Sequence, residues 1–266
     1  MAPGHAFGGN EASAARWFAE QPGWWESHYV QAVDAIVDYL GGDGIRLEGR
    51  RVLDLGCGDG IMALGLAIKT GATSVLGLDL QPVDLVYLAQ QATTHGVEPT
   101  HPRLSFGVSG ETDLGVPDAS IDAVVTWSVF EHVPDLPGLL AEIRRILVPD
   151  GLLFIQIWPL YFSEHGSHLW PWFDESFPHL RLDDATLRSQ LRQRVDSAAL
   201  GDAMLDLYDS CNRLTIDQLG DALVTAGFFV SKVSTGATSV HVPPELQAKP
   251  LSLLMLDEVK VLAVRV

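Results

Sequence analysis

Residues 52–60 constrain the fold more strongly than any other stretch of the chain, and they read VLDLGCGDG. An apolar run that carries Asp54 is followed by glycine at every second position: Gly56, Gly58 and Gly60. Glycine allows positive φ and lets the backbone approach a ligand with no Cβ in between. Amide groups at the start of a following helix would face the same point. The stretch therefore predicts a buried strand, a ligand-binding turn and a helix.

Short apolar runs alternate with helical patterns along most of the chain, which predicts an α/β fold with parallel strands covered on both faces. The expected strands are 51–57, 74–80, 103–109, 121–127, 151–158, 228–235 and 251–266. The expected helices are 11–20, 27–40, 60–70, 82–95, 137–147, 181–195 and 214–228, the last with Thr215 as its N-cap. Residues 1–10 are rich in Gly, Pro and Ala and are expected to be disordered.

The composition narrows the class of partner. The chain has 34 acidic and 17 basic residues, a net charge of −17, whereas nucleic-acid binding needs a basic surface. The longest apolar stretch, 151–162, is too short for a membrane span and contains Gln156 and Pro159. The first residues lack a secretory pattern, and Cys57 and Cys211 are expected to be reduced thiols. We therefore expect a cytoplasmic protein with a small-molecule partner, without nucleic acid or membrane, and leave a homodimer open.

The glycine-rich stretch resembles the first motif of class I S-adenosylmethionine-dependent methyltransferases, in particular the type 11 (UbiE-like) small-molecule methyltransferases. Further stretches resemble this family's later motifs in the same order: GLDL, VPDASIDAVVTWSVFEHVPD, LVPDGLLFIQ and LTIDQLGDALVTAGFFV. The resemblance covers 45–158 and 214–266. It implies a Rossmann-like, doubly wound, mostly parallel seven-stranded sheet with an antiparallel last strand.

The resemblance implies S-adenosylmethionine as cofactor and S-adenosylhomocysteine as product. It assigns Asp79 to the ribose hydroxyls and the loop glycines to the methionine and ribose portion. The chain departs from the family pattern at the acid expected to contact adenine, where Gly110 stands with Glu111 beside it. The cofactor-binding residues implied in total are Asp54, Gly56, Cys57, Gly58, Gly60, Asp79, Leu80, Gly110, Glu111, Trp127 and Ser128. The third glycine of G-x-G-x-x-G is missing, which disfavours a nicotinamide cofactor.

Two polar clusters follow the fourth and fifth expected strands, at the edge where open α/β sheets bind ligands. FEHVPD contains His132, and YFSEHGSHLWPWF contains His165 and His168. Histidine suits the removal of a proton from a hydroxyl nucleophile near neutral pH, so these three are alternatives for a general base. His132 has a second interpretation as a helix cap or cofactor contact, and the later cluster as a packed lid. The expected acceptor-binding residues are Tyr161, Glu164, Trp170 and Trp172.

We interpret residues 1–44 as a helical lid, in which Trp17, Trp24 and Trp25 either cover the cofactor or pack against the sheet. Residues 45–266 form the cofactor-binding domain, with an insertion at 159–213 that caps the acceptor site. No metal is expected. Magnesium remains an alternative, because it orients adjacent hydroxyls in some methyltransferases, yet it prefers oxygen ligands and the chain shows no clear carboxylate set.

These patterns favour methylation of a small molecule, at oxygen on a hydroxylated metabolite, natural product or sugar, with a histidine as general base. Methylation at carbon or nitrogen is the nearest alternative. A protein that binds the cofactor without transferring methyl, such as a cyclase or a regulatory partner, is a second. A nicotinamide-dependent oxidoreductase is a third.

Overall fold

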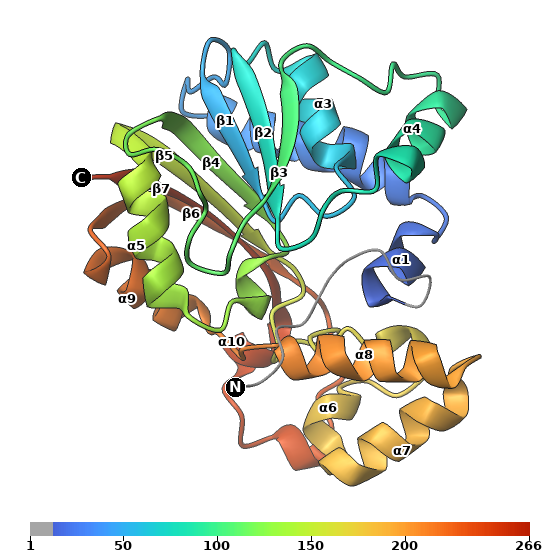
Figure 1. Ribbon diagram of the computed structural model, residues 1–266. Helices are drawn as coiled ribbons and strands as arrows, with labels where there is room; N and C mark the ends of the chain where they lie inside the picture. The colour runs from blue at the N-terminus through green and yellow to red at the C-terminus, as the bar shows by residue number, and fades with distance from the viewer. Residues whose placement is uncertain (1–12) are drawn as a thin grey trace.

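A computed structural model describes residues 13–266. The expected disorder of residues 1–10 lies outside this range. A seven-stranded sheet forms one part of the molecule, and a smaller helical part lies against its edge (Figure 1). The strand order is β3-β2-β1-β4-β5-β7-β6. The strands are β1 (Arg51–Leu55), β2 (Ser74–Asp79), β3 (Leu104–Val108), β4 (Ile121–Trp127), β5 (Leu147–Ile157), β6 (Phe228–Ala237) and β7 (Leu256–Arg265).

The sheet is parallel except at β7, which runs antiparallel to both β5 and β6. The predicted doubly wound sheet with an antiparallel last strand is therefore confirmed. Central strands such as β1 are buried on consecutive residues, which is why they appear in the sequence as unbroken apolar runs. β5 begins earlier than predicted, because Leu147 already pairs with Ile121. The chain around Asp150, which has a positive φ of 60°, forms a bulge before Leu152.

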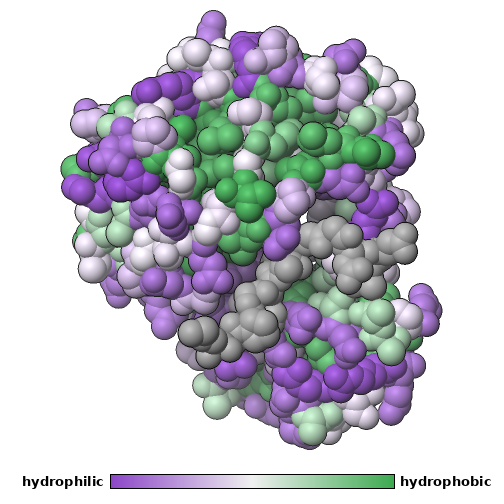
Figure 2. Space-filling model, in the orientation of Figure 1, coloured by the Kyte–Doolittle hydropathy of each residue, from purple (hydrophilic) through white to green (hydrophobic). Residues whose placement is uncertain are grey.

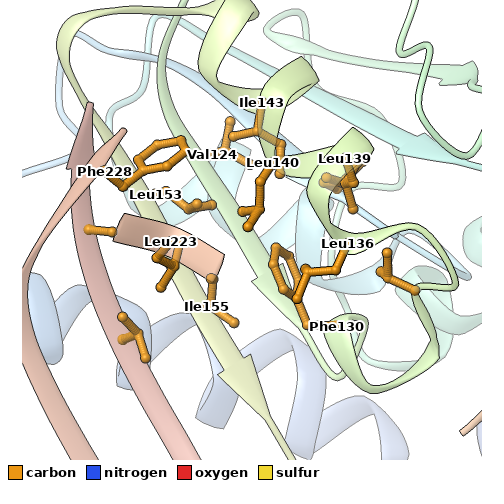
Figure 3. Close-up of a cluster of buried hydrophobic side chains, with 14 of the residues drawn as sticks. Val124, Phe130, Leu136, Leu139, Leu140, Ile143, Leu153, Ile155, Leu223 and Phe228 are labelled. Carbon is orange, nitrogen blue, oxygen red and sulfur yellow. The ribbon is translucent and has the colours of Figure 1, made fainter. Parts of the chain in front are cut away.

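Helices cover both faces of the sheet. α5 (Leu136–Ile146) and α9 (Ile216–Thr225) pack on one face, and their buried side chains meet those of β4 and β5 (Figure 3). The π-helix η1 (Glu26–Ala32), α2 (Val33–Gly41) and α3 (Ile61–Lys69) pack on the other. α4 (Leu85–Thr94) belongs to the same part, whereas α1 (Ala14–Ala19) packs against the segment that follows β5. None of the helices described in residues 13–266 is long and apolar enough to cross a membrane.

The segment after β5 folds into a helical unit with its own apolar core (Figure 1). It contains α6 (Pro178–Arg181), α7 (Asp184–Arg194), α8 (Ala198–Ser210) and a 3-10 turn, η3 (Trp170–Trp172). The sequence predicts one helix at 181–195, whereas α7 begins only at Asp184. α8 is not among the predicted helices, although Ser197 caps it and Leu200, Met204 and Leu207 repeat at helical spacing inside it.

Two further predicted elements differ from the structure. The expected strand at 251–266 begins as a helix, α10 (Leu251–Met255), because its partner β6 ends at Ala237, which pairs with Leu256. In α10, Leu254 packs against Phe177 of the insertion, so this segment joins the two parts of the molecule. The expected helix at 27–40 is divided into η1 and α2.

Thr215→Ala is expected to lower the free energy of unfolding by about 1 kcal/mol, the usual loss when an N-cap is removed. Thr215 and Gln218 form a reciprocal capping box at the start of α9, as the sequence predicts for Thr215. Urea unfolding followed by circular dichroism measures the change. Thr225→Ala in the exposed last turn of α9 is the matched control and should leave stability within a few tenths of a kcal/mol.

Candidate active site

The site lies where the chain reverses its direction of travel across the sheet. β1 has β2 on one side and β4 on the other, so the loops that leave β1 and β4 open a crevice between them. A cavity of about 2110 Å³ occupies this place. Asp79 and Trp127 at the carboxyl edge of the sheet line it, together with His168 and Trp170 of the insertion. Figure 2 shows the surface of the sheet part above that of the smaller helical part. The volume exceeds the roughly 300–1,000 Å³ of a pocket for one small molecule, so two molecules fit together.

The three loop glycines have positive φ, at 76° for Gly56, 54° for Gly58 and 81° for Gly60. A Cβ on Gly56 would collide with Cγ2 of Val129, so the β1 and β4 loops touch here. A Cβ on Gly60 would lie 2.8 Å from the Phe106 ring, whereas the space beside Gly58 is open. Gly58 lines the cavity, and the turn brings its backbone to a ligand there.

Asp79 joins the ends of β2 and β1. Its Oδ2 accepts a hydrogen bond of 2.9 Å from the Gly58 amide, and its Oδ1 accepts one of 3.3 Å from the Gln81 amide. Burial raises the pKa of Asp79, while these amide contacts oppose the rise. The carboxylate therefore lies at the cavity wall in a fixed orientation, as a bidentate contact with a diol requires.

Asp54 lies beneath the same loop, fully buried on β1. Neither of its carboxylate oxygens has a hydrogen-bond partner among the described residues. Burial, reinforced by the charges of Asp79 and Asp59, raises its pKa well above the usual carboxyl range. Asp54 is not among the residues that line the cavity. A contact between its carboxylate and a bound ligand therefore stays a prediction.

Asp54→Asn is expected to increase the stability of the ligand-free protein near neutral pH, because the amide cannot ionise and so avoids the cost of a charge in a fully buried site. The folded protein raises the pKa of Asp54, so it binds the proton more tightly than the unfolded chain does. Stability therefore falls as the pH rises from the unfolded carboxyl pKa through the folded one. Unfolding measured at mildly acidic and mildly alkaline pH should show this fall in the wild type and a smaller one in the variant.

For Asp54→Asn, the matched control is Asp34→Asn, since Asp34 is an exposed partner of Lys69. Equal effects of both substitutions on the pH dependence would contradict the assignment to Asp54.

Asp59 lies in the same glycine loop and was not among the predicted site residues. Its Oδ2 accepts a hydrogen bond of 2.7 Å from the Trp24 indole, and its Oδ1 accepts one of 3.0 Å from the Ile61 amide. The His28 ring stacks on Trp24, with centroids 3.8 Å apart. The acid within GCGDG was the sequence signal that could have indicated Asp59.

Two of the three tryptophans expected to form a lid, Trp17 and Trp24, line the cavity. Trp25 instead packs in the core beside Tyr29.

The other expected cofactor residues line the same cavity: Cys57, Leu80, Gly110, Glu111, Trp127 and Ser128. Ser128 has a left-handed backbone with φ of 52°. Its amide lies 3.0 Å from Oε1 of the buried Gln156, whose Nε2 donates to Glu258 at 3.0 Å. This chain of hydrogen bonds fixes the β4 loop against β5 and β7.

Two of the three candidate histidines meet in the cavity. The ring centroids of His132 and His168 lie 5.0 Å apart. Nδ1 of His132 lies 2.8 Å from the Ser210 hydroxyl, which itself donates to the Leu207 carbonyl at 2.7 Å. Burial lowers the pKa of His132 to about 4. Burial, and then the charges of His132 and His179, lower the pKa of His168 well below its usual value. Both rings are therefore neutral at physiological pH.

The other predicted residues of the insertion take different positions. The His165 ring lies between Trp158 and Trp170, at centroid distances of 6.3 and 5.5 Å. Trp170 lines the cavity and is about two-fifths exposed. The other three predicted acceptor-binding residues have different partners. Tyr161 packs against His179 and Glu164 accepts a hydrogen bond from Ser176 within the insertion, whereas Trp172 packs against Trp17 of α1. Their role in acceptor binding stays a prediction.

Glu131, next to His132, is buried and neither carboxylate oxygen has a partner among the described residues. Burial raises its pKa to about 8. The Asn212 amide donates to the Glu131 carbonyl at 2.8 Å, and the Asn212 side chain donates to the Phe130 carbonyl at 2.6 Å. These hydrogen bonds join the end of the insertion to the β4 loop. Neither FEHVPD nor YFSEHGSHLWPWF predicts this connection.

The sheet topology and the glycine loop define a class I methyltransferase fold. A family model described as "Methyltransferase domain" matches residues 25–230, and the chain belongs to this family. Structures with the same fold include a putative sarcosine dimethylglycine methyltransferase from Galdieria sulphuraria, with a TM-score of 0.57 and 16% identity over 89% of this chain and 86% of that one. A methyltransferase from Aquifex aeolicus has a TM-score of 0.52 and 17% identity, over 93% and 95% of the two chains.

Curated relatives are ubiquinone biosynthesis O-methyltransferases. The protein from Alkalilimnicola ehrlichii is 32% identical over 143 residues, which cover 53% of this chain and 54% of the relative. The one from Paracidovorax citrulli is 40% identical over 114 residues, 42% of this chain and 45% of the relative. The chain thus matches about half the length of these curated relatives. A structure with 21% identity and a TM-score of 0.56, over 93% of both chains, comes from a complex of the Haloferax volcanii Trm112 activator with a putative methyltransferase.

Proposed function

We propose that this protein transfers a methyl group from S-adenosylmethionine to the oxygen of a small hydroxylated acceptor. When bound, the cofactor supplies an electrophilic methyl group on a positively charged sulfur. Asp79 would hold the ribose, and the backbone of Gly58 would lie along the ligand. Residues 1–44 would act as a lid, and the insertion at 159–213 would cap the acceptor. Family membership and the curated O-methyltransferases support this proposal.

The observation that carries the choice of oxygen is the neutral histidine pair beside the cofactor loop. Nε2 of His168 is buried and has no hydrogen-bond partner among the described residues. Such an imidazole can take the proton that an oxygen nucleophile loses as its bond to the methyl carbon forms. Because burial lowers the pKa of His168, it is a weak base. The acceptor hydroxyl must then be acidic, as in a phenol, whose pKa of about 10 lies far below that of an aliphatic alcohol.

The test measures methyl transfer from labelled S-adenosylmethionine to a panel of phenols, sugars and amines, with product mass as the readout. Transfer to a phenolic oxygen, absent in a His168→Gln variant that still binds S-adenosylhomocysteine, is the expected result. Transfer to amines or carbon alone would overturn the assignment to oxygen. Failure of the folded wild type to bind S-adenosylhomocysteine would overturn the whole proposal.

A further inference from the structure

A cluster of nitrogen and sulfur ligands lies in the wall of the cavity. One atom each of His132, His168 and Cys211 lies within 4.8 Å of the other two. These residues come from the loop after β4, from the loop of the insertion and from the end of α8, and all three line the cavity. Three separate segments therefore converge on one point that remains open to a small molecule.

The hydrogen bonds around His132 fix its tautomer. The Ser210 hydroxyl donates its proton to the Leu207 carbonyl at 2.7 Å. Its 2.8 Å contact with Nδ1 of His132 must then use the proton on Nδ1. The lone pair of the neutral ring lies on Nε2, the arrangement in which histidine binds a metal while its other nitrogen is held by a polar partner.

The surroundings of the cluster contain polar groups that the protein leaves unsatisfied. Nε2 of His168 is buried without a partner, and the backbone of His168 has a left-handed φ of 60°. The neighbouring Glu131 carboxyl is also buried without a partner among the described residues. Unsatisfied polar atoms in native proteins call for an explanation, and a bound ion supplies one here.

We propose that His132, His168 and Cys211 bind a divalent metal ion of the zinc class, with the fourth coordination position open to the cavity. Two imidazoles and one thiolate are the ligands that zinc prefers, whereas magnesium and calcium prefer oxygen. On binding, the sulfur gives its proton to solvent and the two rings donate lone pairs. This departs from the expectation of no metal.

The ion and the proposed base exclude one another, a consequence that rests on the proposed function. The ion would occupy the same Nε2 lone pair of His168 that accepts the proton from the acceptor. Zinc-loaded protein should therefore transfer methyl more slowly than chelator-treated protein. Binding of S-adenosylhomocysteine, measured alongside, should be equal in both states because the cluster lies outside the glycine loop.

The deciding experiment is titration of the full chain with Co²⁺, followed by displacement with Zn²⁺. A thiolate-to-cobalt charge-transfer band and intense visible bands of tetrahedral cobalt are expected in the wild type. Cys211→Ser should abolish the charge-transfer band, while Cys57→Ala, which removes the other cysteine, should retain it. Ser210→Ala should weaken metal affinity about 10–100-fold through the lost hydrogen bond to His132. His165→Ala should leave the affinity unchanged.

X-ray absorption on zinc-loaded wild-type protein needs no variant and guards against a Cys211→Ser protein that fails to fold. One sulfur and two imidazole nitrogens around the metal are expected. Absence of tetrahedral cobalt bands in the wild type, or a charge-transfer band that survives in folded Cys211→Ser, would overturn the proposed site. Because these readouts do not involve methyl transfer, they distinguish failure of the metal site from failure of the proposed function.

Discussion

Asp79→Ala is expected to weaken binding of S-adenosylhomocysteine by about 100-fold or more. In the proposed complex the carboxylate accepts two hydrogen bonds from the ribose, and each bond to a charged group contributes about 1.5–3 kcal/mol. Its 2.9 Å contact with the Gly58 amide also fixes the glycine loop. Isothermal titration calorimetry measures the loss, and a thermal shift on ligand addition should disappear with it.

Two further variants separate the ribose contact from a general effect on the loop. Asp79→Asn keeps one carbonyl oxygen for the Gly58 amide and loses the charge, so binding should fall between wild type and Asp79→Ala. Asp118→Ala, a change at an exposed partner of Arg145, is the matched control and should bind like wild type. Wild-type affinity in folded Asp79→Ala would contradict the assignment of this carboxylate to the cofactor.

His168→Gln is expected to lower kcat for the phenolic acceptor about 10²–10⁴-fold, the usual contribution of a general base. Affinity for S-adenosylhomocysteine should stay near that of the wild type, because His168 lies on the insertion and not on the glycine loop. His165→Gln is the matched control, since the His165 ring lies between Trp158 and Trp170. Equal losses in both variants would contradict the choice of His168 over His165.

The pH dependence gives a second readout on the same base. Burial lowers the pKa of His168, so the ring stays neutral and able to accept a proton when the pH falls below that of an ordinary histidine, about 6.5. The rate in metal-free protein should therefore be level through this range and decline only at lower pH. A decline centred on the ordinary histidine pKa would indicate an exposed base instead.

The free energy of unfolding should also depend on pH through two other histidines, His132 and His179. Burial lowers the pKa of His132 and of His179 to about 4, so the unfolded chain binds protons more readily than the folded one. The contribution of these two neutral histidines to stability is complete above the histidine pKa of the unfolded chain, about 6.5. It is lost as the pH falls through their pKa of about 4 in the folded protein. This loss on acidification runs opposite to the effect of Asp54, and the two can be separated by Asp54→Asn.

The sequence by itself determined the sheet and the cofactor loop. Parallel strands that are buried on both faces are continuous apolar runs in the sequence. A turn with positive φ at Gly56 and Gly60 favours glycine. Both features can therefore be predicted from short stretches of sequence. The role of Asp79 was expected from the family resemblance, which places an acid at the end of the strand next to the glycine strand.

Only the tertiary structure decided which polar residues share the acceptor side of the cavity. His132, His168 and Cys211 are far apart in the sequence and meet because the end of α8 packs against the β4 loop through Asn212. Tyr161 and Trp172 are aromatic like Trp170, yet Tyr161 is buried in the core of the insertion and Trp172 packs against Trp17 of α1. Side-chain burial in such a unit depends on contacts between distant segments, and no local spacing records them.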